Sequence, residues 1–216
     1  MQPIISIVGK SGVGKTTLLE GLIIDLKRRG YKVAVIKHAG DDFELDKKGK
    51  DSWRLSQAGG GVVAVSSPHK LVVMRQMEHD QSPQELSRFI GWDCDLILTE
   101  GFKQGNNPKI EVHRKEQGKE LLCPPQQLLA VVTDEPLDVD VPQFSADEVQ
   151  RLVDLIESRL QAEGKEDNVD LLVNDVPVSL NPFVNNFLAK TLLAMVSALK
   201  GVKRVKSLHI LLRRKA

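Results

Sequence analysis

The sequence contains little cysteine, carries almost no net charge and has no long uninterrupted apolar run. Its only cysteines, Cys94 and Cys123, lack metal-site spacing, so we interpret them as incidental thiols in a reducing compartment. The 30 basic and 29 acidic residues give a net charge of +1, which excludes a global field that attracts nucleic acid or an anionic membrane. No apolar segment reaches about 18 residues, and no signal-peptide pattern opens the chain. We therefore expect a soluble, cytoplasmic protein.

One segment near the amino terminus has a specific chemical meaning. Residues 9–16 read Gly-Lys-Ser-Gly-Val-Gly-Lys-Thr, which fits the P-loop pattern G-x-x-x-x-G-K-[ST] directly after an apolar run over residues 3–8. In such a loop, backbone N–H groups surround phosphate oxygens, the lysine reaches the terminal phosphates, and the hydroxyl ligates Mg²⁺. The sequence therefore predicts a nucleoside triphosphate site whose residues are Gly9, Ser11, Gly12, Val13, Gly14, Lys15, Thr16 and Thr17.

Strand-like and helix-like segments alternate along most of the chain. Strands are expected over residues 3–8, 32–37, 61–66, 71–74, 95–99 and 128–132. Helices are expected from the P-loop to Gly30 and over 51–58, 83–90 and 146–160. This alternation predicts an α/β fold, a P-loop NTPase three-layer sandwich with a mainly parallel sheet covered by helices on both faces. Ligands of such sheets bind at the carboxyl ends of the strands.

The composition changes near the carboxyl end and divides the chain. We expect a nucleotide-binding domain over residues 1–162, a polar linker over 163–168 and a small α+β module over 169–216. The module is predicted as ββαβ, with strands over 169–173, 176–180 and 205–212, and with a helix that Asn181 caps and Pro182 begins. Because about 50 residues form a marginal core alone, we expect the module to pack on the main domain or on a second copy.

A second group of candidates follows the strand over residues 95–99. Glu100 stands at the carboxyl end of that apolar strand, where a carboxylate for Mg²⁺ is needed. Gly101 allows the backbone to approach the γ-phosphate. No glutamine follows to position an attacking water, and Phe102 stands there instead. We therefore predict slow hydrolysis.

Ionisable residues after other strands are further candidates. His38 directly follows the strand over 32–37, and Asp46 and Asp51 lie in the charged segment after it. We interpret them as substrate or switch residues, or else as ordinary packed or solvated side chains. Asp134 follows the strand over 128–132, where a carboxylate that selects guanine often stands, but no Asn/Thr-Lys-x-Asp motif surrounds it. The spacing leaves GTP and ATP open.

Lys10 places a second lysine at the start of the loop. Deviant P-loops use such a lysine to reach the phosphates of a partner subunit's nucleotide, which predicts a homodimer with Lys10 in a catalytic role beside Lys15 and Glu100. The alternative is an exposed loop lysine, because Ser11 stands where that pattern usually has glycine.

Several motifs together resemble the MobB family, the molybdopterin-guanine dinucleotide biosynthesis adaptor proteins. They are the P-loop, Val-Ile-Lys-His ending at His38, the Phe-Glu-Leu-Asp to Ser-Trp-Arg run over 43–54, Leu-Thr-Glu-Gly-Phe-Lys over 98–103 and Pro-Lys-Ile-Glu-Val-His-Arg over 108–114. The resemblance implies a GTP- and Mg²⁺-binding protein with feeble GTPase activity and dimer-forming relatives. It also implies partners, namely the guanylyltransferase that joins GMP to molybdopterin, molybdoenzyme maturation proteins, and molybdopterin guanine dinucleotide or its precursor.

The chain departs from that family pattern in two places. Residues 39–41 are Ala-Gly-Asp where the family often has further histidines, and Lys48 stands where it often has proline. Two rival functions stay open: a small-molecule P-loop kinase, for which Arg54, Arg75 and Arg88 are candidate lid residues, and a metal-delivery GTPase similar to the nickel-insertion proteins.

Overall fold

The computed structural model describes residues 2–40, 43, 46–90, 94–118, 120–163, 169–174, 176–203, 205 and 207–212. The chain divides into two compact units, residues 2–154 and residues 155–216. The first unit contains β1 (Ile4–Val8), α1 (Lys15–Arg28), β2 (Val33–Lys37), α2 (Asp51–Gln57), β3 (Val62–Ser67), β4 (Lys70–Arg75), α3 (Pro83–Ile90), β5 (Leu96–Glu100), β6 (Lys109–Val112), the 3₁₀ turns η1 (Lys115–Gln117) and η2 (Pro125–Gln127), β7 (Leu128–Val132), β8 (Gln143–Phe144) and the start of α4 (Val149–Glu163).

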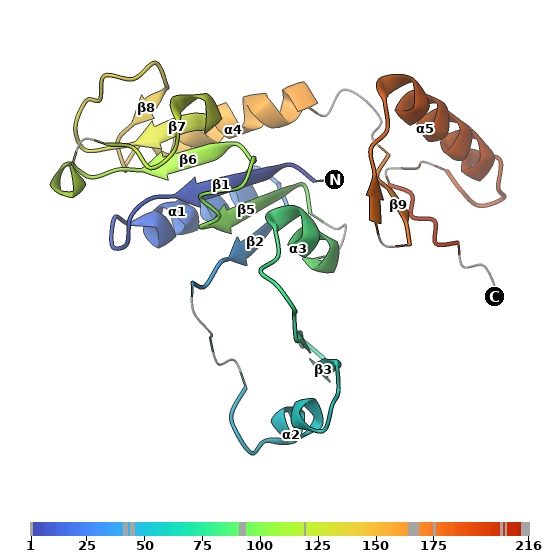
Figure 1. Cartoon of the computed structure of the whole chain (residues 1–216). Coiled ribbons are helices and arrows are strands. Elements are labelled where there is room, and N and C mark those ends of the chain that lie inside the picture. The colour runs from blue at the N-terminus through green and yellow to red at the C-terminus, as the bar shows by residue number, and fades with distance from the viewer. Residues whose placement is uncertain are drawn as a thin grey trace. The chain divides into compact units, whose positions relative to one another are not determined.

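A six-stranded sheet with the strand order β2-β5-β1-β6-β7-β8 forms the centre of the first unit (Figure 1). Every strand pair within it is parallel. β1, β5, β6 and β7 supply most of its buried apolar residues, since they lie between other strands. The predicted α/β architecture with a mainly parallel sheet is confirmed. β1 stands between β5 and β6, so the P-loop leaves the sheet between the carboxyl ends of these two strands.

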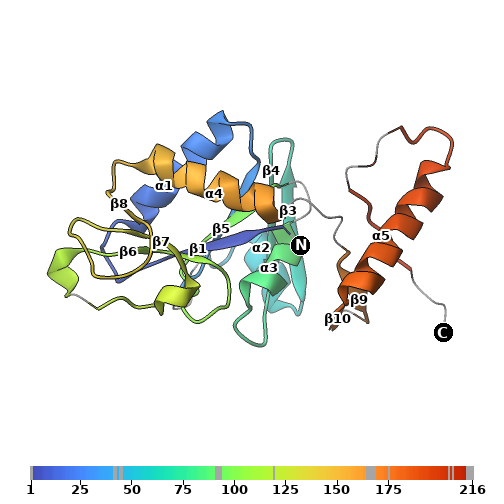
Figure 2. The same cartoon turned by 90° about the horizontal axis from the view of Figure 1, so that it is seen from above.

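Helices cover both faces of this sheet. In the view from above, α1 and the start of α4 lie on one face and α3 lies on the other (Figure 2). α1 and α4 pack closely, because a Cβ added to Gly21 would lie 3.3 Å from Val149 Cγ2. An ion pair of 2.6 Å between Arg29 Nη1 and Asp154 Oδ1 also joins the two helices. These contacts build the predicted three layers and fix the direction in which α1 leaves the P-loop.

The segments predicted as strands over 61–66 and 71–74 do form strands, but they do not join the parallel sheet. β3 and β4 pair antiparallel with each other as a separate hairpin, which Figure 1 shows apart from the main sheet. Only two residues connect Ser67 to Lys70, and a connection this short permits an antiparallel pair but no parallel crossover. The hairpin exposes a set of large apolar side chains, Val62, Val65, Leu71 and Val73.

The second unit contains the rest of α4, a hairpin of β9 (Leu171–Val173) and β10 (Val176–Val178), and α5 (Pro182–Ser197). The predicted cap of α5 is confirmed, because Asn181 Oδ1 accepts a hydrogen bond of 2.9 Å from the N–H of Val184. The predicted strand over 205–212 is wrong for the described residues of that segment, which do not form a strand. Its apolar residues suit a strand, but a strand needs an adjacent edge to pair with.

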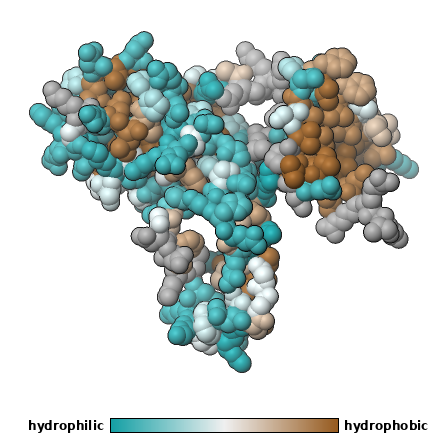
Figure 3. All heavy atoms as spheres, viewed as in Figure 1, coloured by the Kyte–Doolittle hydropathy of each residue, from teal (hydrophilic) through white to brown (hydrophobic). Residues whose placement is uncertain are grey.

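Apolar residues cover much of the visible face of the second unit (Figure 3). On α5 they include Phe183, which is 79% exposed, and Phe187 and Met195. Helices with this much apolar surface are normally covered by other protein, so packing of the module on another unit or copy stays a prediction. Within the described residues no helix is both long and apolar enough to cross a membrane.

Candidate nucleotide-binding site

The P-loop lies between β1 and α1, and its glycines adopt backbone conformations that other residues rarely adopt. Gly9, Gly12 and Gly14 all have positive φ, at 150°, 78° and 97°. A Cβ on Gly9 would lie 2.5 Å from the carbonyl oxygen of Val112 on β6, so no larger residue fits there without movement. No atom of the described residues lies within 4 Å of the Cβ position of Gly12, which leaves the middle of the loop open. The loop therefore has a rigid base and an accessible centre.

The residues after the open centre lead into α1. Val13 is buried and anchors the loop, whereas Ser11 and Thr17 are exposed. Gly14 precedes the first turn of α1, which has no side-chain cap and no acidic residue. Lys15 Nζ donates a hydrogen bond of 2.8 Å to the carbonyl of Lys10. The first N–H groups of α1 and the lysine ammonium therefore offer donors to an anion.

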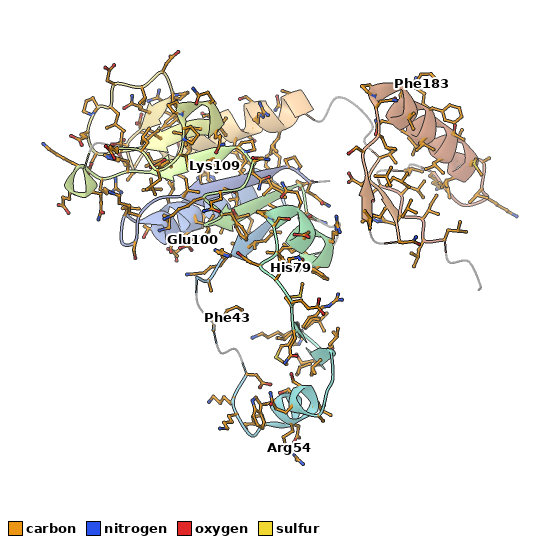
Figure 4. All side chains as sticks on the ribbon, in the orientation of Figure 1. Phe43, Arg54, His79, Glu100, Lys109 and Phe183 are labelled. Carbon is orange, nitrogen blue, oxygen red and sulfur yellow. The ribbon has the colours of Figure 1, made fainter. Side chains whose placement is uncertain are left out.

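Thr16 and Glu100 meet at the base of the loop. Thr16 Oγ1 lies 3.1 Å from Glu100 Oε1 and 3.2 Å from Oε2, so its hydroxyl donates to the carboxylate. Lys37 Nζ lies 3.6 Å from Oε2, and the Glu100 side chain is 14% exposed. Figure 4 shows Glu100 at the carboxyl end of the sheet. A hydroxyl and a carboxylate are oxygen ligands that Mg²⁺ prefers.

Gly101 and Phe102 turn the chain away from β5 beside His38. Gly101 has φ 106°, and its Cβ position lies 3.0 Å from His38 Cβ, so glycine is required for this close approach. Phe102 also has positive φ, and its ring centroid lies 4.7 Å from that of His38. The imidazole Nε2 lies 3.0 Å from Asp80 Oδ2. His38 is thus adjacent to the Glu100 segment but is engaged by an aromatic ring and a carboxylate.

The structure does not bring Asp46 and Asp51 to the P-loop through any contact that it describes. Asp46 Oδ1 accepts hydrogen bonds from the N–H of Lys47 and the hydroxyl of Ser52, and so stabilises the chain before α2. Asp51 lies 3.7 Å from Arg54 on the same helix, and Figure 4 shows Arg54 on α2, away from Glu100. Their predicted substrate or switch role stays a prediction. Four residues of the same charged region, 41, 42, 44 and 45, lie outside the described chain.

Asp134 lies at the carboxyl end of β7 but holds the backbone of a neighbouring loop. Its Oδ1 accepts a hydrogen bond of 2.9 Å from the N–H of Lys115 in η1. This hydrogen bond, with smaller contributions from the charges of Arg114 and His113, lowers the pKa of Asp134. The same loop accepts a hydrogen bond from Lys10 at the carbonyl of Gln117. Loop 113–118 therefore lies beside the P-loop.

Sequence reasoning missed the strand β6 and its row of buried ionisable residues. Lys109, Glu111 and His113 alternate along one face and are 0%, 1% and 4% exposed. Lys109 Nζ donates to Gln127 Oε1 and to backbone carbonyls, while Glu111 accepts from the N–H groups of Leu122 and Cys123. Figure 4 shows Lys109 within the first unit. The signal was the two-residue alternation of these side chains with Ile110 and Val112.

The described cysteines and acids form no metal centre. Neither Cys94 nor Cys123 forms a disulfide, and burial raises the pKa of the Cys123 thiol. Within the described ranges, no cluster of three or more His, Cys, Asp or Glu side chains could hold a metal ion. The site thus contains a phosphate-type loop with one carboxylate and one hydroxyl at its base.

The family model for molybdopterin guanine dinucleotide synthesis protein B matches residues 4–134, more than half of the chain. The chain belongs to the MobB family. A relative from Haemophilus influenzae, named molybdopterin-guanine dinucleotide biosynthesis adapter protein, is 39% identical over 162 residues, which cover 73% of this chain and 89% of that protein. The crystal structure of Bacillus subtilis MobB has a TM-score of 0.58 and 30% identity, and the match covers 73% of this chain and 97% of that one.

The carboxyl-terminal residues of this MobB-family chain lie beyond the family match, which ends at residue 134. They nevertheless have a counterpart, because a relative from Methanocaldococcus jannaschii aligns with 96% of this chain and 96% of its own length at 27% identity. The alignment with that relative therefore extends into the second unit, while the P-loop, Glu100 and the Pro-Lys-Ile-Glu-Val-His-Arg segment lie within the MobB match.

Proposed function

We propose that this protein is a GTP-binding adapter in the biosynthesis of molybdopterin guanine dinucleotide, and that it hydrolyses GTP slowly. The observation that carries the proposal is the contact of Thr16 with Glu100 beneath an open P-loop. A MobB-family relative with the adapter name supports the pathway. The resemblance of the motifs to the same family supports GTP over ATP.

The residues of the loop fit a triphosphate and its magnesium ion. The Lys15 ammonium is held by the carbonyl of Lys10, and a phosphate oxygen can replace that acceptor. Mg²⁺ would be held by the Thr16 hydroxyl and, directly or through water, by Glu100. Bound there, the ion neutralises charge on the phosphates, while the loop N–H groups orient them.

The slow hydrolysis of GTP is inferred from the residues that follow Glu100. Phe102 occupies the place of a water-positioning glutamine, and its ring packs against His38. The His38 imidazole beside that ring is itself engaged by Asp80. Such a site retains its nucleotide, which suits a protein that presents GTP or the finished dinucleotide to other proteins.

Two rival functions receive less support from the arrangement of the side chains. A kinase lid needs arginines over the phosphates, but Arg54 pairs with Asp51 on α2, and Arg75 lies 5.5 Å over the ring of Phe89. A metal-delivery GTPase needs a cargo site, and the described residues offer no cluster that would hold the metal. The proposed partners are the guanylyltransferase of the pathway, molybdoenzyme maturation proteins, and molybdopterin guanine dinucleotide or its precursor, all in the cytoplasm.

The proposal includes a homodimer, with Lys10 acting on the partner's nucleotide. Its support is the β3–β4 hairpin, which exposes Leu71 and Val73 on one face and Val65 on the other. Lys10 would have to exchange the Gln117 carbonyl of its own chain for the partner's phosphate. Light scattering after gel filtration tests this: we expect a dimer for the wild type and a monomer for Leu71→Asp. A monomeric wild type would contradict the homodimer.

The decisive experiment is a titration of GTP, ATP and molybdopterin guanine dinucleotide against the wild type and Lys15→Ala. Loss of the lysine should weaken GTP binding about 100-fold, because a charged hydrogen bond to phosphate is lost. Lys27→Ala, at an exposed lysine in the last turn of the same helix, is the matched control. Unchanged GTP affinity in Lys15→Ala would sink the proposal. A partner-free turnover above about 1 s⁻¹, the scale of efficient phosphoryl transfer, would sink the adapter role.

A further inference from the structure

Arg114 lies against the last glycine of the P-loop. It follows β6 after a single residue, and its Nη2 lies 3.6 Å from the position that a Cβ on Gly14 would occupy. β6 is the neighbour of β1 on the side opposite β5. The loop is therefore flanked by Glu100 at the end of β5 and by a guanidinium just after β6.

The loop that carries Arg114 is fastened at both sides. His113 is buried, and its Nε2 lies 2.6 Å from the carbonyl oxygen of Gly118; because a carbonyl can only accept, Nε2 carries the proton. Asp134 accepts the N–H of Lys115 at 2.9 Å. These two contacts hold the chain on each side of Arg114, so its position is set by the fold rather than by a flexible tether.

The charge of Arg114 has no ion-pair partner within the part of the chain that the structure describes. Its side chain is half-buried, and no carboxylate forms a salt bridge with it there. The nearby carboxylate of Asp134 is stabilised by the charge of Arg114, but it accepts its hydrogen bond from the N–H of Lys115 and forms no ion pair with the guanidinium. The first turn of α1, next to it, contains no acid. A guanidinium against Gly14, the residue that precedes the uncapped N–H groups of α1, calls for an anion.

We propose that Arg114 binds a phosphate group of the nucleotide in its own chain, and that His113 and Asp134 are positioning residues for it. This proposal rests on the proposed nucleotide site. The planar guanidinium can donate two parallel hydrogen bonds to phosphate oxygens. Asp134 then acts through the backbone of Lys115, and guanine recognition falls to other residues.

The test measures GTP affinity with a fluorescent GTP analogue and the melting temperature of the nucleotide-free, full-length protein. We expect Arg114→Ala to weaken binding at least about 10-fold, the effect of losing a charge-assisted hydrogen bond, with an unchanged melting temperature. Arg114→Lys should restore part of the affinity because it keeps the charge but not the paired donors. Lys115→Ala, an exposed lysine of the same loop, should bind within about 2-fold of the wild type.

The role of Asp134 is separated from base recognition by comparing GTP with ITP, which lacks the exocyclic amino group of guanine. A positioning role predicts that Asp134→Ala weakens both nucleotides by the same factor and that Asp134→Asn, which keeps an acceptor, restores them. A loss confined to GTP would overturn this assignment. Wild-type affinity in Arg114→Ala, with binding lost in Lys15→Ala, would overturn the Arg114 proposal alone. Absence of nucleotide binding in the wild type would overturn both proposals.

Discussion

Thr16 and Glu100 are 84 residues apart in the sequence, yet the hydroxyl of one donates to the carboxylate of the other. The contact follows from the sheet, because the parallel pairing of β1 with β5 sets Ile7 opposite Glu100. The P-loop that follows β1 leads into α1, whose first turn brings Thr16 back over the same edge. The magnesium ligands of the proposed site are thus assembled by strand order.

Removing the charge of Glu100 should weaken the dependence of nucleotide affinity on magnesium. In Glu100→Gln we expect the gain in GTP affinity between EDTA and excess Mg²⁺ to fall by about 10-fold, since a neutral amide holds the ion and its water less strongly. Calorimetric titration measures both conditions. Glu20→Gln, at an exposed acid on α1, is the control. A full magnesium effect in Glu100→Gln would exclude this residue from the metal site.

A side chain at Gly9 should destabilise the protein without any nucleotide present. The added Cβ would lie 2.5 Å from the Val112 carbonyl at a φ of 150°, so β1 and β6 must separate. We expect Gly9→Ala to lower the free energy of unfolding by about 2 to 4 kcal/mol, through overpacking and backbone strain. Urea denaturation measures it. Gly61→Ala, at an open position, should change it by less than about 1 kcal/mol. Equal changes in unfolding free energy for Gly9→Ala and Gly61→Ala would show that the P-loop can move to accommodate the added methyl group.

Glu111 should contribute to stability through the loop that it holds. Its carboxylate accepts from the N–H groups of Leu122 and Cys123 while 1% exposed. In Glu111→Gln an amide NH₂ has to face backbone donors, which should cost about 1 to 3 kcal/mol of unfolding free energy. Denaturant titration compares it with Glu116→Gln, an exposed acid in η1. Two indistinguishable curves would mean that the buried carboxylate is not needed by the loop.

The depressed pKa of Asp134 predicts a small loss of stability in acid. Its folded-state pKa lies below its usual value because the carboxylate accepts the N–H of Lys115. The carboxylate therefore stabilises the folded state above the unfolded pKa of about 3.9, and this stabilisation is lost as the pH falls through the folded pKa. Melting temperatures of the wild type and Asp134→Ala should differ at pH 7 and converge below about pH 4. A difference that persists at low pH would assign the effect to packing instead.

Several elements could be predicted because their signals are local. The spacing of Leu18, Leu19, Leu22 and Leu26 predicts α1, and all four are buried as that spacing requires. β1, β5 and β7 read as apolar runs because they are covered on both faces. The strand β6 could not be recognised in this way, because Lys109 and Glu111 look exposed until the loops that satisfy them are folded around it.

The residues of the candidate site also differ in whether a local sequence signal predicts them. The loop residues and Glu100 were predicted from their own neighbours in the sequence, whereas the role of Arg114 was not, since nothing near it in the chain suggests a phosphate. Asp134 was predicted as a possible guanine-reading residue from its place after β7. The structure shows its carboxylate turned to the backbone of Lys115.

The sequence by itself determined that a P-loop follows a buried strand, because the eight consecutive residues 9–16 contain everything that the motif requires. Its glycines allow the backbone to surround phosphate, its lysine supplies the positive charge, and its threonine supplies the hydroxyl for magnesium. It also determined the α/β class through hydrophobic periodicity. Only the tertiary structure decided which side chains border that loop. Strand order brings the ends of β5, β6 and β7 to one edge of the sheet, and contacts between such distant segments depend on packing that no local pattern encodes.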